Sequence, residues 1–134
     1  VYPEVEDTLK NLKGLGWKLG ICTNKPAYLA KGLLKKLDLL NYFSALVGSD
    51  SFPYRKPDPR ALLDTIKLLN ADVKNSLLIG DSKTDRDTAL AAGVPIIMVK
   101  FGHGALNHSI ESLEPDAIIN NFFELPDLAK KLIN

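Results

Sequence analysis

The chain has 134 residues, of which 46% are hydrophobic and 25% charged, and its 17 basic and 16 acidic side chains give a net charge of +1. This length favours one domain, residues 1–134, that buries a core without disulfides or structural metals. The balanced charge excludes the basic footprint of a nucleic-acid-binding protein, and no apolar stretch reaches the roughly 18 residues of a membrane span. Cys22 is the only cysteine. It excludes an intrachain disulfide and a cysteine-built zinc site, so we expect a cytoplasmic protein.

Five short apolar runs predict strands. They are rich in Ile, Val and Leu and end near Gly, Asp, Asn or Lys, which is typical of strands covered on both faces. In chain order they are Lys18–Cys22, Ala45–Val47, Ser76–Ile79, Pro95–Val99 and Ala117–Ile119.

Helical spacing of apolar residues separates these runs. It predicts helices over Val5–Leu15, Leu29–Leu37, Leu62–Leu69 and Leu125–Ile133, and a further helix opens after Ser82. Local signals agree: Pro26 and Pro59 suit first turns, Asp58 suits an N-cap, and Gly14, Gly16 and Gly93 suit helix ends. Phe101–Glu114 is predicted to be a loop, with a helical turn from Ala105. Alternating strands and helices indicate an α/β fold with a parallel sheet.

Polar residues follow three of the predicted strands, where parallel sheets carry their working residues. A hydroxyl, an amide, a lysine and two carboxylates would meet on one rim: Thr23, Asn24, Lys56, Asp81 and Asp85. This combination is typical of a site for phosphate and a metal ion.

Each of these residues also has an ordinary structural interpretation. Asp81 and Asp85 offer the carboxylate oxygens that Mg²⁺ prefers, but Ser82 and Asp85 also fit a helix capping box. Thr23 and Asn24 fit a phosphate cradle at a helix start, or an Asn-capped turn. A lysine before a proline is held extended and can aim its ammonium at phosphate, although a loop lysine is usually solvated.

Three further residues attract less functional interest. Cys22 is expected to be a small buried hydrophobe, Trp17 to lie at the core edge, and His103 to be a loop residue.

The motifs resemble those of the haloacid dehalogenase-like phosphatases. Gly80–Asp85, followed by Ala89, Ala92 and Gly93, looks like their acidic motif, and Ile21–Lys25 resembles their hydroxyl motif. Gly48–Pro59 resembles their lysine motif and, with Pro115–Ile119, points to the phosphoglycolate phosphatase-like branch. The match runs in order along essentially the whole chain. It implies a Rossmann-like three-layer sandwich with a mostly parallel sheet.

The resemblance also implies roles for individual residues. Asp81 would bind Mg²⁺ and Asp85 would support the metal site. Thr23 and the Asn24 backbone would hold the phosphoryl oxygens, while Lys56 would neutralise phosphate charge. The implied substrate is a small phosphorylated metabolite, and no nucleic-acid or membrane partner is expected.

One family motif has no match in this sequence. Family members carry an Asp-x-Asp string on their first core strand, whose first Asp attacks phosphorus, and a helical cap follows it. Val1 resembles a point just downstream of that cap, so we expect a partial core that lacks the family's first core strand. Without the nucleophile we expect the chain alone to be inactive. The strand Lys18–Cys22 is then predicted to pair directly with Leu77–Ile79, although a missing N-terminal segment or a second copy could fill the slot.

Two alternatives belong to other functional classes. A receiver-type phosphoacceptor domain also uses aspartates, a Thr and a Lys at strand ends, but in a receiver the acidic residues precede the Thr and Lys. A catalytically silent phosphate- or Mg²⁺-binding scaffold domain is compatible with every residue above.

Overall fold

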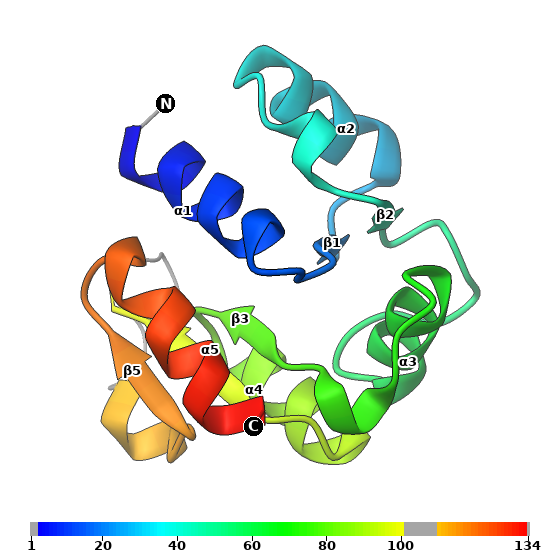
Figure 1. Cartoon of the computed structure of the whole chain (residues 1–134). Helices are drawn as coiled ribbons and strands as arrows, with labels where there is room; N and C mark the ends of the chain where they lie inside the picture. The colour runs from blue at the N-terminus through cyan, green and yellow to red at the C-terminus, as the bar shows by residue number, and fades with distance from the viewer. Residues whose placement is uncertain (1–2, 101–109, 134) are drawn as a thin grey trace.

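The computed structural model describes residues 3–100 and 110–133, along which helices and parallel strands alternate (Figure 1). The strands are β1 (Gly20–Cys22), β2 (Ala45–Val47), β3 (Leu78–Gly80), β4 (Ile96–Val99) and β5 (Ala117–Ile119). The α-helices are α1 (Pro3–Gly14), α2 (Ala27–Lys36), α3 (Pro59–Leu68), α4 (Lys83–Ala92) and α5 (Leu125–Ile133). All the strand pairs among these residues are parallel, so the predicted α/β class is confirmed.

The element boundaries follow the local sequence signals closely. Asp58 caps α3 by accepting a hydrogen bond from the Arg60 N–H, with Pro59 in the first turn. Pro26 lies at the N-cap of α2, one residue before the predicted first turn. Gly93 ends α4 with a φ of 74°, a left-handed conformation that favours glycine. Three of the strands begin one or two residues later than predicted.

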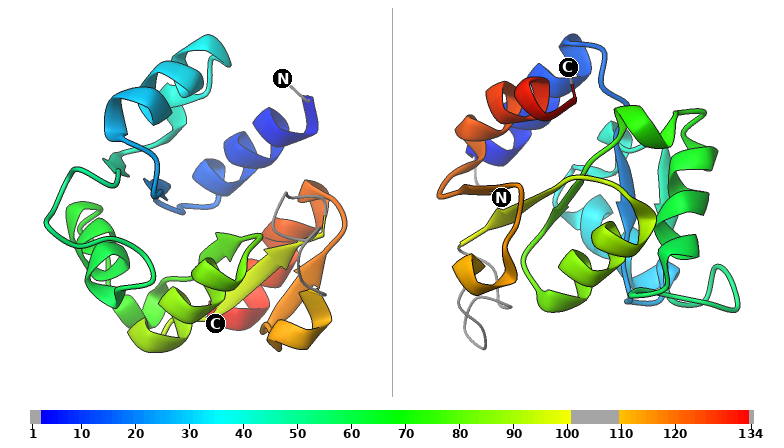
Figure 2. Two further views of the ribbon diagram at one scale, coloured as in Figure 1. Left: turned by 180° about the vertical axis from the view of Figure 1, so that it is seen from behind. Right: turned by 90° about the horizontal axis from the view of Figure 1, so that it is seen from below.

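The strands lie between two layers of helices, as the predicted sandwich requires. Along β4 the side chains alternate: Ile96 and Met98 pack with α3 and α4, whereas Ile97 and Val99 pack with α1 and α5. Figure 2 shows α1 and α5 side by side on one side of the strands. Trp17, as predicted, lies at the edge of the core, packed against the second of these clusters.

The predicted pairing of Lys18–Cys22 with Leu77–Ile79 is wrong. Among the described residues β1 pairs with β2, and β3 pairs with β4, which pairs with β5, so the strands form two separate sheets. Side chains join the two sheets instead. Helix α3 packs against β1, β2 and α4. Leu19, just before β1, packs into the cluster that also holds Leu77 and Ile79. Burial of apolar surface therefore connects the sheets without a hydrogen-bond ladder between them.

Two expectations concern the remaining segments. The predicted loop over Phe101–Glu114 falls largely on residues 101–109, so His103 and the turn from Ala105 lie outside the described residues. The part that is described forms a 3₁₀ helix, η4 (Ile110–Leu113), in which Leu113 is buried. No helix within residues 3–100 and 110–133 is long and apolar enough to cross a membrane.

Candidate active site

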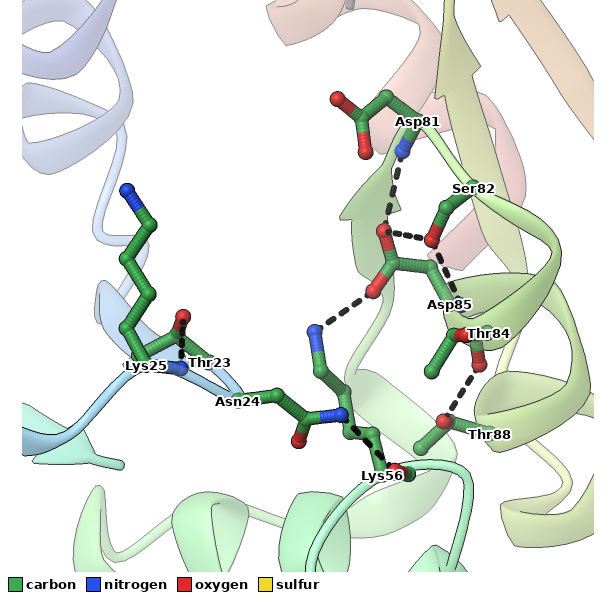
Figure 3. Close-up of polar contacts among 9 residues, drawn as sticks. All are labelled: Thr23, Asn24, Lys25, Lys56, Asp81, Ser82, Thr84, Asp85 and Thr88. Atoms are coloured by element: carbon green, nitrogen blue, oxygen red, sulfur yellow. Dashed lines mark hydrogen bonds and ion pairs between the residues drawn. The ribbon is translucent and has the colours of Figure 1, made fainter. Parts of the chain in front are cut away.

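The carboxyl ends of β1 and β3 bring the predicted polar residues into one region (Figure 3). Thr23 and Asn24 follow β1, and Asp81 follows β3. Asp85 lies in the first turn of α4. Lys56 comes from the loop between β2 and α3 and extends toward Asp85 (Figure 3).

A buried ion pair forms the centre of this region. The distance from Lys56 Nζ to Asp85 Oδ1 is 2.6 Å, and the two side chains are only 12% and 10% exposed. The other oxygen of Asp85, Oδ2, accepts hydrogen bonds from the Asp81 N–H at 3.0 Å and from Ser82 Oγ at 3.2 Å. A charge removed from water needs such additional partners, because its desolvation otherwise outweighs the attraction.

The geometry bears out half of the capping-box interpretation of Ser82 and Asp85, and it leaves the metal interpretation of Asp85 a prediction. Ser82 is the N-cap of α4, and its Oγ accepts a hydrogen bond from the Asp85 N–H at 3.3 Å. The Asp85 carboxylate turns back to the Asp81 backbone and to Lys56. Gly80 permits this arrangement, because a Cβ at that position would lie closer than 3.0 Å to the Asp85 side chain.

Thr23 and Asn24 form the other side of the site. Asn24 Nδ2 donates a hydrogen bond to the Lys56 carbonyl oxygen at 2.9 Å, which ties the two loops together. Thr23 Oγ1 accepts from the Lys25 N–H at 3.1 Å, so the hydroxyl proton can be donated to a bound anion. The N–H groups of Lys25 and Ala27 both have protein acceptors, so the predicted cradle of backbone N–H groups is smaller than the sequence suggested.

The loop that carries Lys56 is anchored by aromatic residues that our sequence interpretation did not use. The Tyr54 hydroxyl donates to the Asp64 carboxylate on α3, and this bond raises the pKa of Tyr54. The Arg60 guanidinium lies 4.1 Å from the centroid of the Tyr54 ring, and Phe52 stacks on that ring at 5.5 Å. The alternation of Phe52 and Tyr54 in a loop was the available signal.

Cys22 ends β1 as a free thiol close to the same region. Burial raises the pKa of Cys22, an effect that a hydrogen bond with Thr65 and the nearby Lys56 charge oppose. The raised pKa favours the neutral thiol at pH 7, as expected of an unreactive residue, but Cys22 is partly buried rather than buried as predicted.

Asp81 is the described residue whose chemistry best fits Mg²⁺. Its side chain is half-buried, and its carboxylate has no hydrogen-bond or ion-pair partner within residues 3–100 and 110–133. Those residues hold no group of three or more Asp, Glu, His or Cys side chains that could enclose a metal ion. Mg²⁺ usually binds through one or two carboxylates and keeps waters and phosphate oxygens as its other ligands, so Asp81 fits this cation.

Parallel strands with polar residues at their carboxyl ends define a Rossmann-like α/β protein. Residues 1–99 match the family model described as haloacid dehalogenase-like hydrolase. The chain belongs to the haloacid dehalogenase-like hydrolase family, and the resemblance seen in the sequence is confirmed.

Known relatives extend this match beyond residue 99. The chain is 41% identical over 133 residues to a phosphoglycolate phosphatase of Mesorhizobium japonicum, covering 98% of this chain and 58% of that protein. It is 42% identical over 134 residues to one of Agrobacterium fabrum, covering 99% of this chain and 57% of that protein. The chain thus spans less than two thirds of these relatives.

Solved structures give the same fold. A crystal structure described as a predicted phosphoglycolate phosphatase of Haemophilus somnus has a TM-score of 0.88 at 30% identity, covering 95% of this chain and 56% of that chain. A hydrolase of Geobacter sulfurreducens has a TM-score of 0.79 at 27% identity, covering 96% and 60%. The Rossmann-like architecture is therefore confirmed by comparison as well as by topology.

The sequence contains one Asp-x-Asp string, Asp85–Asp87, and it lies in α4 rather than at the end of a strand. Asp87 forms ion pairs with the exposed Lys83 and with the partly buried Arg86. The Asp85 carboxylate already forms an ion pair with Lys56. This string therefore does not substitute for the strand-end motif that the family uses.

Proposed function

We propose that this chain supplies the phosphate- and metal-handling part of a Mg²⁺-dependent phosphomonoester hydrolase of the phosphoglycolate phosphatase type. The observation that carries the proposal is the Lys56–Asp85 pair, which lies between Thr23 and Asp81 (Figure 3) and whose side chains are only 12% and 10% exposed. The relatives named phosphoglycolate phosphatase match nearly the whole of this chain, and their name supports a small phosphorylated carboxylic acid as the substrate.

The roles follow from the chemistry of each group. The Lys56 ammonium, held by Asp85, neutralises charge on the phosphoryl group. The Thr23 hydroxyl donates a hydrogen bond to a phosphoryl oxygen, and the Asn24 backbone contributes a further N–H. Asn24 also fixes the loop of Lys56 through its side chain. All of these contacts bind and orient the phosphoryl group rather than attack it.

Asp81 is the proposed Mg²⁺ ligand, and Asp85 supports it by holding the Asp81 N–H. Bound Mg²⁺ would neutralise phosphate charge and orient the phosphoryl group for in-line attack. The attack itself needs a carboxylate nucleophile, which would form an aspartyl-phosphate while the ester P–O bond breaks and the alcohol of the substrate leaves. Because the 134-residue sequence has no Asp-x-Asp at a strand end, we expect the isolated chain to be inactive.

The two sheets suggest where that nucleophile enters. Neither β1 nor β3 has a strand partner on its second edge among the described residues. Strand edges readily bind an extended segment through backbone hydrogen bonds. We propose that a strand from the part of the protein that its relatives have and this sequence does not, or from a second copy, pairs with these edges and carries the attacking Asp.

A silent phosphate- or Mg²⁺-binding scaffold is the second candidate. The observation that favours it is the position of the chain's one Asp-x-Asp string in α4. Under this alternative the site binds phosphate but no added segment restores turnover. We also keep a cytoplasmic location as a proposal, because the single, half-buried thiol of Cys22 needs no oxidising compartment.

One experiment separates these possibilities. The chain alone, assayed with an aryl phosphate and Mg²⁺, should show no turnover; activity that Asp81→Asn abolishes would contradict the expectation. Fusing the chain to the complementary segment of the Mesorhizobium japonicum relative should then produce a phosphatase. An inactive but folded fusion that still binds phosphate would favour the scaffold.

Variants of the active fusion test the shared site. Lys56→Ala and Asp81→Asn should each reduce kcat/KM strongly, and their double variant should lose much less than the product of the two single losses. Lys83→Ala is the matched control, because Lys83 is an exposed lysine of α4 whose ion pair among the described residues is with Asp87. Losses that simply multiply would contradict a common site.

A further inference from the structure

The N-terminus of α2 is capped from a distant part of the chain. Pro26, at the N-cap position, makes no side-chain capping bond. The Ala27 N–H, the first of the helix, instead donates to Asp50 Oδ1 at 2.9 Å. Asp50 lies in the loop after β2, 23 residues further along the sequence. The loop of one strand therefore fixes the helix that follows its neighbour.

Asp50 belongs to a turn, Gly48–Ser51, that holds the same backbone at further points. The Ser49 N–H donates to the Lys25 carbonyl at 2.9 Å. A Cβ at Gly48 would lie closer than 3.0 Å to the Ala27 nitrogen and the Lys25 oxygen, so the two backbones are in direct contact. Ser51 Oγ closes the turn by accepting from the Gly48 N–H at 2.8 Å.

The backbone held in this way carries the Thr23 hydroxyl. The Lys25 N–H donates to Thr23 Oγ1, while the carbonyl of the same residue is bound by Ser49. The orientation of the hydroxyl thus depends on a segment that the turn fixes from both sides, at Lys25 and at Ala27.

The hydrogen bond from the Ala27 N–H to Asp50 has a second consequence. A helix N-terminus carries about half a positive charge and is a ready anion site. At α2 a carboxylate of the protein already occupies that site. A phosphate group is therefore directed away from Ala27 and toward the Thr23 hydroxyl and Lys56.

We propose that Asp50 is a positioning residue of the phosphate site. It holds the Lys25–Ala27 backbone so that the Thr23 hydroxyl faces the bound phosphate, and it keeps that phosphate off the start of α2. The inference rests on the proposed function for the identity of the anion. The geometric part, the coupling from Asp50 through the backbone to Thr23, stands on the contacts alone.

Amide hydrogen exchange measured by NMR on the 134-residue chain tests the geometric part without a ligand. Asp50→Ala should speed exchange of the Ala27 amide about fivefold or more, the effect of losing one helix cap, and should also speed exchange of the Lys25 amide. Asp72→Ala is the control, because Asp72 precedes η2 (Val73–Asn75) without a side-chain capping bond. Faster exchange at Ala27 with no change at Lys25 would overturn the proposal, since Asp50 would then be a cap only.

Titration with inorganic phosphate tests the functional part. Thr23→Val should weaken phosphate binding about tenfold in the wild-type chain and in Asp50→Asn, which keeps the acceptor oxygen. In Asp50→Ala the same change should have an effect of less than about twofold, because the hydroxyl is no longer positioned. An equal Thr23 effect in all three backgrounds would overturn the proposal. A wild-type chain that binds no phosphate would count against the proposed function, while the exchange experiment still decides the role of Asp50.

Discussion

The molecule has two halves, a smaller one around the sheet β1–β2 and a larger one around the sheet β3–β4–β5, and they are built differently. The sheet β3–β4–β5 has a central strand, β4, whose four residues are all buried, and helices cover both of its faces. The sheet β1–β2 has two strands, and all three residues of β1 are only partly buried. The larger half therefore holds both clusters of buried residues, to which α3 contributes Leu62 and Ile66, whereas the smaller half is covered by α2 and α3.

The candidate site joins these unequal halves. Thr23 and Asn24 belong to the smaller half, Asp81 and Asp85 to the larger, and Lys56 bonds to both through Asn24 and Asp85. The polar contacts of the site therefore also hold the two halves of the molecule together. Three changes, ordered by expected effect, test this comparison.

Removing the Asp85 carboxylate should give the largest effect. Asp85→Ala leaves the Lys56 ammonium buried without its partner, and breaking a buried pair in this way costs about 3–5 kcal/mol of unfolding free energy. Asp87→Ala, two residues along the same helix, removes only ion pairs that are partly exposed to solvent and should cost less than about 1 kcal/mol. Urea unfolding of both variants measures the contrast, with Asp85→Asn in reserve if Asp85→Ala does not fold. Equal losses would mean that the pair does not hold the halves together.

Adding one methyl group at Gly80 should give the next largest effect. Its Cβ would clash with Asp85, so Gly80→Ala should destabilise the chain by about 1–3 kcal/mol. Gly32 lies inside α2, and a Cβ added there would have no neighbouring atom within 4 Å. Gly32→Ala should therefore stabilise the chain by about 0.5–1 kcal/mol. Thermal unfolding should therefore shift in opposite directions for the two variants. A neutral Gly80→Ala would show that Asp85 can move away without cost.

Trimming one methyl group from each sheet gives the smallest and most direct comparison. Ile97 is 0% exposed in β4, so Ile97→Val should cost about 0.5–1.5 kcal/mol. Ile21 is the middle residue of β1 and only partly buried, so Ile21→Val should cost less than about 0.5 kcal/mol. Chemical denaturation of the matched pair measures both values. A larger loss at Ile21 would reverse our ranking of the two halves.

The larger half was the more predictable from sequence. The uninterrupted apolar run at Pro95–Val99 leaves no choice but a strand covered on both faces, and β4 is such a strand. Short-range signals such as Asp58 before Pro59, or Gly93 after a helix, were equally reliable, because each acts within a single turn of the chain.

Long-range partners were the part that sequence could not supply. The sequence identified Thr23 and Asp81 because each comes after a predicted strand, and it identified Lys56 because this residue lies in the loop after another strand. Nothing in the local pattern near residue 50 says that its carboxylate caps a helix 23 residues earlier. The separation of the sheets was missed for the same reason: apolar edges are compatible with pairing, and no local pattern says which strands pair.

Trp17, packed where the connection between α1 and β1 meets the cluster of the larger sheet, is the chain's only tryptophan. Its intrinsic fluorescence is therefore a single-site signal from the junction of the two halves. Emission that shifts to the red while far-ultraviolet circular dichroism stays constant would report the halves separating with their helices intact. No extrinsic label is needed to follow that event.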